Sequence, residues 1–533
     1  MSIRASRAGT PSNGDLTGSA RKRPSSRTIA PALLAIAFAC SPFGLALARA
    51  ESLADALALA YQTNPTLQSQ RAQVRAVDET YVQAKAGAGP SAQAQVTGAY
   101  NRTNLPGASP LQPPGQIGTN TAEGQVSISQ PIYSGGRTAA AVDIAQARIA
   151  AGRAQLEATE AAVMLAVITA YSDVLRDTQA LDVRRQHLEM LAHQLDVAKA
   201  RQSAGEATLT DVAQAEAQLA GVRALVSDAQ NQLQISRAAY ATVVGQNPGE
   251  LTPEPDLPGI PASVDDAFRL AEAQSPDLAL AQQNEAISHA QVIAARVAYR
   301  PSISVSANAG YAATSEPFFG RSNDWDVSAL ATLTAPLFTN GAAASGVRQA
   351  LEQNTSDRIA VEGARRAVVQ SVADAWNQMI TARADVGFQQ EQVRAASAAF
   401  KGMQIEYDAG ERSTLDVLLA EETLRNAELA LLAAEHDQYV AVAQVLRFVG
   451  RLQGPDLIAS LPPYDPAKHL RHVRHAGMVP WTDAIVGVDQ IALPGARTHA
   501  IPQPQRAVNP TLKPPSTPVP PDAPIATAIP VAK

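Results

Sequence analysis

The chain has 533 residues, of which 46% are hydrophobic, 17% charged and only 4% aromatic, and its formal net charge is −6. A chain of this length can bury a sizeable core and form roughly two to four domains. The only cysteine, Cys40, excludes a disulfide framework, a Cys-based zinc site and an iron–sulfur cluster. The negative net charge provides no field that attracts nucleic acid, so no nucleic-acid partner is expected.

Residues 1–50 have the organisation of a secretory signal peptide. Four cations between positions 21 and 27 precede an apolar stretch from Pro31 to Leu47, and Ala48-Arg49-Ala50 follows it. This pattern predicts export and cleavage after Ala50. The residues before Cys40 vaguely resemble a lipoprotein cleavage site, so lipidation is the less favoured alternative. Because no later segment has ~18 consecutive apolar residues, we expect a periplasmic, outer-membrane or secreted protein.

Residues 51–250 and 263–452 are predicted to be two structural repeats joined by a linker at 251–262. The segment Ser52–Ala56 aligns with Ser263–Ala267, and Gln130-Pro131-Ile132-Tyr133 aligns with Ala335-Pro336-Leu337-Phe338. The length difference between the halves falls in segments rich in Gly, Pro, Asn and Ser, which are typical of loops. The chain is therefore a tandem duplication.

Each half is predicted to run helix, strand, loop, strand, very long helix, tight turn and long helix. The strand segments alternate apolar and polar residues, and each has about ten residues, as a tilted membrane strand requires. We therefore favour a membrane β-barrel over a soluble hairpin that packs on helices. The strand segments are residues 92–101, 125–133, 301–311 and 325–338, and the aromatic residues expected at their ends, at the membrane interface, are Tyr100, Tyr133, Tyr311, Trp325 and Phe338.

The predicted helices are longer than a globular domain needs. No proline occurs between Arg137 and Gln202, and small or apolar residues recur there at spacings of three and four. This pattern indicates coiled-coil packing at close approach. A helix of this length would be a rod of roughly 100 Å.

Four strands cannot close a membrane barrel, because about eight is the practical minimum. An open sheet edge is not tolerated in lipid. Three chains would supply twelve strands and a twelve-helix tube, so we expect a homotrimer.

From Glu51 to about Leu452 the chain resembles the TolC family of outer-membrane channel proteins. The resemblance rests on Asn64-Pro65, on the run Pro131–Gly136 with its partner Pro336–Gly341, and on Tyr407–Leu418 with its counterpart Ala204–Val212. It implies a mixed α and β membrane protein: a trimeric, twelve-stranded barrel in the outer membrane, continued by a helical tunnel in the periplasm. It also implies docking to a periplasmic adaptor (membrane fusion) protein and to an inner-membrane RND-type or ABC transporter, for drug efflux or type I protein secretion.

The two turns between the long helices contain the candidate gate. Gly205 and Gly410 suit the left-handed turn that ends a helix, and Thr208–Asp211 and Ser413–Asp416 fit the helix capping box. The family resemblance places these turns at the periplasmic mouth of the tunnel. It implies that Arg412 and Tyr407 bond to Thr210 or Asp211 in the closed state and that the adaptor docks at the tips, with Gly205, Glu206, Gly410 and Glu411 as the expected docking residues.

The resemblance also implies that Asp416 forms a three-fold acidic ring in the lumen, which would favour cations. The family's second acid, one turn further on, is replaced here by Leu419, so the ring system is expected to be weaker. Glu421 and Glu422 are expected on a solvated helix face.

No motif for catalysis, nucleotide binding or metallopeptidase chemistry occurs, so we expect no catalytic residue, no cofactor and no resident metal. The run His469-x-x-His472-x-x-His475 lies among cations, which oppose a bound metal. Residues 453–533 are Pro-rich and are expected to form a disordered tail. The alternative to a channel is a soluble periplasmic adaptor or coiled-coil scaffold without a pore, but two hairpins and two strand pairs argue against it.

Overall fold

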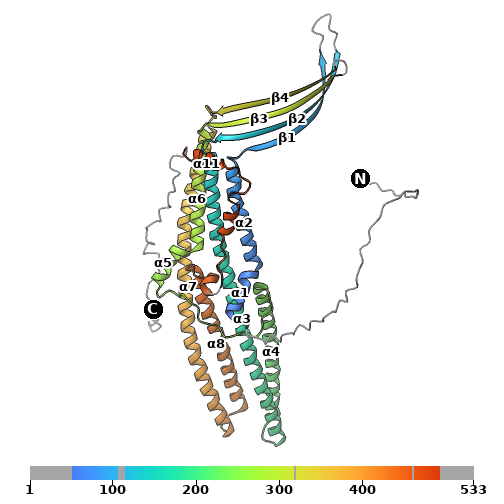
Figure 1. Cartoon of the computed structure of the whole chain (residues 1–533). Helices are drawn as coiled ribbons and strands as arrows, with labels where there is room; N and C mark the ends of the chain where they lie inside the picture. The colour runs from blue at the N-terminus through green and yellow to red at the C-terminus, as the bar shows by residue number, and fades with distance from the viewer. Residues whose placement is uncertain (1–50, 106–114, 317–319, 459–460, 492–533) are drawn as a thin grey trace, which may run out of the picture. The chain divides into compact units, whose positions relative to one another are not determined.

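The computed structural model describes residues 51–105, 115–316, 320–458 and 461–491 (Figure 1). The expected signal peptide, the cleavage site after Ala50, Cys40 and residues 492–533 lie outside the described residues. The same order of elements occurs twice. The first set is α1 (Leu53–Thr63), α2 (Pro65–Ala86), β1 (Ser91–Leu105), β2 (Gly115–Tyr133), α3 (Arg137–Ser203) and α4 (Leu209–Val244). The second set is α5 (Val264–Gln274), α6 (Pro276–Arg296), a 3-10 turn η1 (Val297–Tyr299), β3 (Ser302–Glu316), β4 (Gly320–Thr334), α7 (Ala342–Asp408) and α8 (Thr414–Phe448).

The opening helix predicted for each half is in fact a pair of helices. Pro65 and Pro276 each occupy the first turn of the second helix, where their missing N–H costs nothing. Asn64 caps α2 by accepting from the backbone N–H groups of Thr66 and Leu67. Its amide also donates to the carbonyl of Val243 on α4, at 2.8 Å, so the break fixes the N-terminal helices against the first hairpin.

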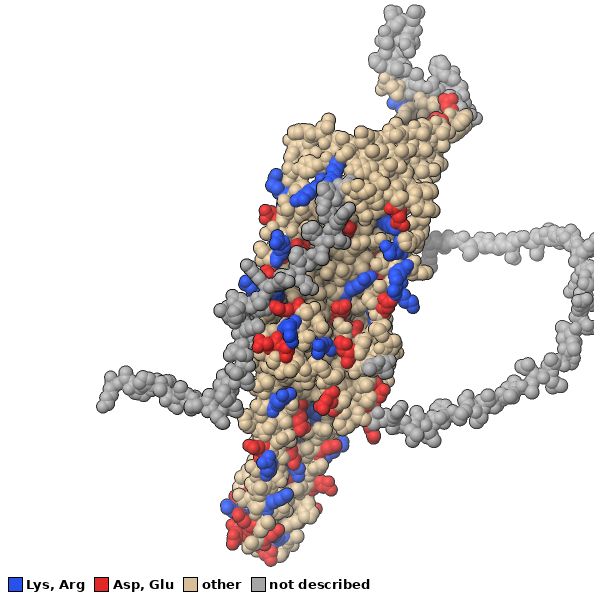
Figure 2. Space-filling view, turned by 60° about the vertical axis from the view of Figure 1, so that its left-hand side comes forward, with Lys and Arg blue, Asp and Glu red and all other residues tan. Residues whose placement is uncertain are grey.

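The four strands form one antiparallel sheet in the order β1-β2-β3-β4. In this register the apolar residues of the four strands lie on one face of the sheet and the polar residues on the other. One row of the apolar face holds Ala94, Val126, Ala309 and Val327, and the adjacent row of the polar face holds Gln93, Ser127, Asn308 and Ser328. The apolar face is solvent-exposed in the single chain, with Val96 86% exposed, and in the view of Figure 2 charged side chains cover the helices and are nearly absent from the sheet.

The strands are longer than predicted, with 15 to 19 residues instead of about ten. Of the five aromatic residues expected at strand ends, only Tyr133 is a terminal strand residue; Tyr100, Tyr311 and Trp325 lie within strands, and Phe338 follows the end of β4. Tyr311 pairs with Trp325 across β3 and β4, whereas Tyr133 pairs with Ile303 at the helical end of the sheet. The positions from Ile303 to Tyr311 span about 26 Å along the strand. Tyr133 at one end and Tyr311 with Trp325 at the other therefore bound a band of about membrane thickness, whereas Tyr100 lies four residues beyond it, where strand pairing continues.

The long helices form two hairpins, α3 with α4 and α7 with α8. Both α3 and α7 have 67 residues, which corresponds to about 100 Å each. Their contact residues are mostly small or aliphatic, for example Ala215, Leu219 and Val222 on α4, which permits close packing. Among the described helices only α3 is long and apolar enough to cross a membrane, but 56% of its most apolar stretch is buried inside the protein, so we attribute its composition to the core.

The prediction that residues 453–533 form a disordered tail is wrong as far as Ile491. This segment contains α9 (Gly454–Leu457), α10 (Ala467–Val473) and α11 (Thr482–Ile491). Its composition was misleading because the segment has no core of its own: it packs Ile458 and Leu461 into the main core and adds directed polar contacts. Lys85 on α2 pairs with Asp483, and Asp489 is buried at the start of α3 with 1% exposure.

Gly450 marks a close approach between the two ends of the second repeat. It follows α8 with a φ of +78°, and a Cβ there would overlap the carbonyl oxygen of Gln274 at the end of α5. Gly341 before α7 has a similar φ of +80° but open space around it. Substitutions at these two glycines therefore distinguish the cost of backbone strain, present at both, from the cost of a steric clash, present only at Gly450.

We expect Gly450→Ala to lower the free energy of unfolding by about 3 kcal/mol or more, because α8 and α5 must separate. Gly341→Ala should cost about 1–2 kcal/mol, from left-handed backbone strain alone. Thermal unfolding of the two purified variants, followed by tryptophan fluorescence, measures the difference. Equal losses would show that the approach of Gln274 does not constrain the fold.

Candidate pore gate at the hairpin tips

Each hairpin ends in a tight turn with the same construction. α3 and α7 stop before Gly205 and Gly410, whose φ angles are +80° and +82°. The return helices begin with capping boxes at Thr208 and Ser413, as predicted. Glycine is required because only it adopts this left-handed conformation without strain.

The carboxylates of Asp211 and Asp416 are both engaged in these boxes. Asp211 accepts from the backbone N–H and the hydroxyl of Thr208, each at 2.8 Å. Asp416 accepts from the same groups of Ser413 at 3.0 and 2.8 Å. These hydrogen bonds lower the pKa of both aspartates, so both are charged at neutral pH and a three-fold assembly would bring together three copies of each charge.

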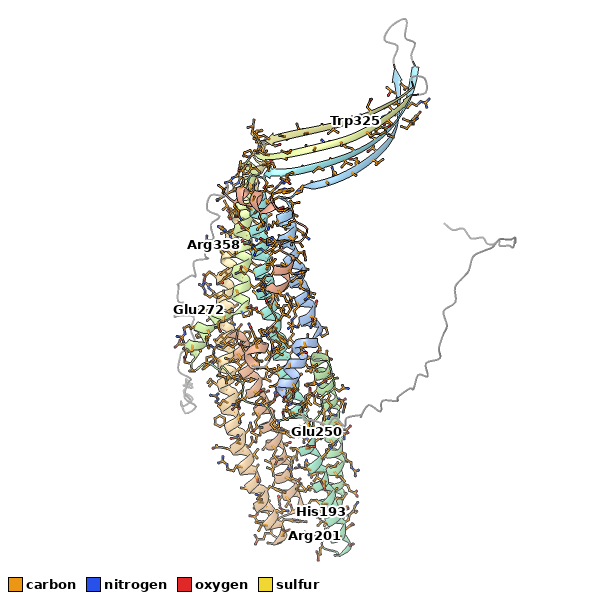
Figure 3. All side chains as sticks on the ribbon, viewed as in Figure 1. His193, Arg201, Glu250, Glu272, Trp325 and Arg358 are labelled. Carbon is orange, nitrogen blue, oxygen red and sulfur yellow. The ribbon has the colours of Figure 1, made fainter. Side chains whose placement is uncertain are left out.

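The predicted gate residues contact their own chain as follows. Arg412 pairs with Glu406 at 2.7 Å on the same hairpin. Tyr407 accepts from the Thr414 hydroxyl at 3.4 Å, and the guanidinium of Arg201 lies 4.6 Å from its ring centroid. Figure 3 shows Arg201 at the end of α3, so this cation–π contact links the tips of the two hairpins within one chain. Sequence reasoning missed it, because residues 206 positions apart carry no local signal of contact.

The resemblance implies that the bonds from Arg412 and Tyr407 to Thr210 or Asp211 link neighbouring hairpins. Thr210 is exposed at the tip of the first hairpin, so its side chain is accessible to a neighbouring hairpin. These bonds remain a prediction.

The expected adaptor-docking residues Gly205, Glu206, Gly410 and Glu411 are exposed. The docking ranges expected from the sequence, Gly205–Leu209 and Gly410–Leu415, each end in an exposed leucine, Leu209 with 72% and Leu415 with 36% exposure. Both leucines lie inside the capping boxes. An exposed leucine at each tip offers an apolar anchor to a docking protein.

Above the tips, two histidine–carboxylate pairs cross the packed surface between α3 and α8, which we call the hairpin seam. His187 on α3 lies 4.0 Å from Glu421 on α8. Asp173 on α3 lies 3.1 Å from His436 on α8. The histidine is thus on opposite helices in the two pairs, which are about 21 Å apart along α3.

The two pairs differ in charge because their surroundings differ. Burial raises the pKa of Glu421 to about 7, and burial together with Arg425 and Arg184 lowers the pKa of His187 to about 4. This pair is therefore neutral in mildly acidic solution. Burial also opposes the charged form of His436, but contacts with Asp173 and Asp437 outweigh it and raise its pKa, so the second pair is ionic. The expectation that Glu421 is solvated is wrong, since it is fully buried, whereas Glu422 is exposed as expected.

Two of the three histidines of the C-terminal segment lie near separate acids. His469 contacts Glu79 at 2.9 Å, and His475 lies 3.7 Å from Asp483. Within the four described stretches, no three His, Cys, Asp or Glu side chains converge as a metal site requires.

A duplicated chain with one amphipathic sheet and two very long helical hairpins defines a channel-tunnel protein of the outer membrane. Comparison with known proteins agrees. Residues 56–246 and 267–451 match the family model described as outer membrane efflux protein, and the chain belongs to this family.

Three relatives illustrate the extent of the similarity. The chain is 32% identical to the outer membrane efflux protein BepC of Brucella suis, over 80% of this chain and 91% of BepC. It is 26% identical to the outer membrane protein TolC of Vibrio cholerae, over 77% of this chain and 93% of TolC. The outer membrane channel CmeC of Campylobacter jejuni has the same fold, with a TM-score of 0.65 at 16% identity, over 79% of this chain and 88% of CmeC. Because the chain belongs to this family, it is an outer-membrane channel protein and not a soluble adaptor.

The buried Glu421 generates a prediction on stability. Its pKa is about 7 in the folded chain and near 4.5 when unfolded. As the pH rises between these values, the unfolded chain loses this proton while the folded chain keeps it, so this residue's contribution to stability falls. Glu421→Gln, which stays neutral, should gain up to about 3 kcal/mol relative to the wild type by pH 7–8 and nothing below about pH 4.

Melting temperatures of the purified protein at about pH 5 and pH 8 measure this gain. His187 titrates in the opposite direction below pH 6.5 in both proteins, so the difference between wild type and variant isolates Glu421. Glu422→Gln, on the exposed neighbouring position, is the matched control and should show no such pH-dependent gain. A constant offset between wild type and Glu421→Gln at both pH values would contradict the buried neutral carboxyl.

Proposed function

We propose that three copies of this chain form an outer-membrane channel-tunnel that gives passive exit across the periplasm and the outer membrane. The main support is the sheet: its edges, β1 and β4, have no partner in the described chain, and lipid does not tolerate open edges. Pairing β1 of one copy with β4 of the next closes twelve strands into a barrel. The homotrimer follows from this closure.

The faces of the sheet set the orientation of the barrel. The apolar rows of Ala94 and Val126 face lipid, and the polar rows of Gln93 and Ser127 line the lumen. The long helices of the three copies then form a twelve-helix tube in the periplasm. Substrate passes through water inside the tube, and diameter and lumen charge determine selectivity.

The hairpin tips close the tube at its periplasmic end. Arg412 and Tyr407 of one chain bond to Thr210 or Asp211 of the next, and opening requires the hairpins to move apart. Glu406 competes for Arg412 within its own chain, because the two already form an ion pair. Opening therefore exchanges one salt bridge for another, and the exposed Arg412 loses little electrostatic energy.

The chain carries no motif for binding a nucleotide, so the free energy for transport comes from its partners. We propose a periplasmic adaptor protein that docks at the tips around Leu209 and Leu415, and an inner-membrane transporter, RND-type or ABC, that loads the tunnel. Drug efflux is the favoured use, because a relative named as an efflux protein aligns over 91% of its length; type I protein secretion uses the same duct.

Single-channel conductance in planar bilayers tests the gate. The wild type should show small openings. Arg412→Ser combined with Tyr407→Phe should raise the conductance of the closed state severalfold, because the bonds between chains are removed. Lys401→Ala, which removes an exposed cation of the same helix, should leave it unchanged. Unchanged conductance in the double variant would refute the gate assignment while leaving the pore intact.

The reversal potential under a salt gradient tests the acidic ring. Asp416→Asn should shift the selectivity away from cations, because three lumen charges disappear. Ser413→Ala breaks the same capping box without removing a charge and is the matched control, which should retain cation selectivity. If both variants shift the reversal potential equally, Asp416 has no special place in the lumen.

A further inference from the structure

The helix α11 lies beyond the residues matched by the family model. It has one face that is buried against the protein and a second, apolar face that is exposed. Thr482, Val486 and Asp489 are buried against the protein. A second face, about 120° wide at 100° per residue, is largely exposed in the described chain, with only Ile485 partly buried. Its members are Trp481 just before the helix, Ala484, Ile485, Val488 and Ile491, of which Trp481, Val488 and Ile491 are 52%, 51% and 86% exposed. Polar positions fill the remaining arc.

Asp489 fixes the rotation of α11. Its carboxylate accepts from the backbone N–H groups of Ser134, Gly136 and Thr138, at 2.9, 3.0 and 3.1 Å. Gly136 is the N-cap of α3 and has no side chain to cap it, so Asp489 supplies the missing cap and meets the positive end of the helix dipole. A side chain held by these hydrogen bonds cannot turn, and the exposed face of α11 is therefore presented in one direction.

That direction is the lipid side of the barrel. The indole N–H of Trp481 donates to the Gln130 amide oxygen at 3.3 Å. Gln130 pairs with Val305 and so shares the apolar face of the sheet, at the helical end of β2. The exposed face of α11 thus continues the apolar band of the sheet at its periplasmic border, where tryptophan is favoured.

The chain just before α11 is strongly basic. Residues 468–475 contain three Lys or Arg and three His and no acidic residue, although Arg471 pairs with Asp465 and two of the histidines contact acids outside this stretch. A basic segment joined to a helix with an apolar face and a tryptophan is typical of segments that lie in the headgroup region of a bilayer.

We propose that α11 is an interfacial helix that inserts the face of Trp481, Val488 and Ile491 between the phospholipids of the periplasmic leaflet of the outer membrane. It forms, in a trimer, three anchors around the base of the barrel. Asp489 holds each anchor on the helix that begins the tunnel, so the bilayer contacts the tunnel as well as the strands. The proposal rests on the outer-membrane location of the sheet and not on the gate.

Fluorescence quenching in vesicles tests it. The full-length protein is reconstituted into phosphatidylethanolamine–phosphatidylglycerol vesicles that carry brominated acyl chains. The chain has three tryptophans, and three single-tryptophan variants are compared, in each of which the other two are replaced by Phe. Trp481 should be quenched most by bromines near the headgroups. Trp325, on the lipid face of the sheet and 77% exposed, is the positive control, and Trp376, packed against the helical core, should not be quenched.

Two further outcomes would overturn the proposal. Quenching of Trp481 by aqueous acrylamide without quenching by brominated lipid would place α11 in water. Protection from both quenchers would show that another protein surface, a neighbouring copy or the segment after residue 491, covers this face. In either case quenching of Trp325 reports separately that the barrel is inserted.

A second variant guards against indirect effects. Val488→Asn combined with Ile491→Asn changes two exposed positions that contribute nothing to the buried face. It should reduce the lipid quenching of Trp481 to the level of Trp376 and leave that of Trp325 unchanged. Retained quenching would mean that this face is not the one that enters the bilayer.

Discussion

The unpaired edges of β1 and β4 are the constraint from which the rest of the assembly follows. A sheet of four strands with one apolar face has no stable place in water or, alone, in lipid, because its edge N–H and C=O groups need partners. Closure through neighbouring copies satisfies both edges and the apolar face together. In the proposed trimer it would also place three hairpin pairs around a common axis, so that the pore, the tunnel and the proposed contacts at its mouth would all follow from one hydrogen-bonding requirement.

The repeated helices and strands were predictable because their signals are local and periodic. Alternation in Ala92–Tyr100 and Ile303–Tyr311 identified the apolar face, and Gly205 and Gly410 identified the turns. The ends of the strands were not predictable, since backbone pairing continues through polar residues that no longer meet lipid. Glu421 and the C-terminal segment were misjudged for a different reason: composition describes an average environment, whereas His187 and Asp489 act through single contacts between residues distant in sequence.

The hairpin seam shows how the same residue types serve different purposes in one fold. His436 and Asp173 are close enough to remain charged, and they hold α3 and α8 as an ion pair. His187 and Glu421 are too deeply buried and too poorly hydrogen-bonded to do so, and they remain neutral. The ion pair lies toward the middle of the hairpins and the neutral pair toward their tips, so the electrostatic link between α3 and α8 weakens toward the end that the proposed gate would open.

The cap that Asp489 provides to α3 has no counterpart at α7 within the described residues, where Gly341 is the N-cap without a side-chain bond. The duplication is therefore broken at the junction of barrel and tunnel. At the start of α7 the only side-chain bond among the described residues is the one that the Thr339 hydroxyl accepts from the Ala343 N–H. In a trimer, α3 helices fastened by Asp489 would therefore alternate with α7 helices that lack this cap, and a twisting force on the tunnel would act first on the three α7 junctions.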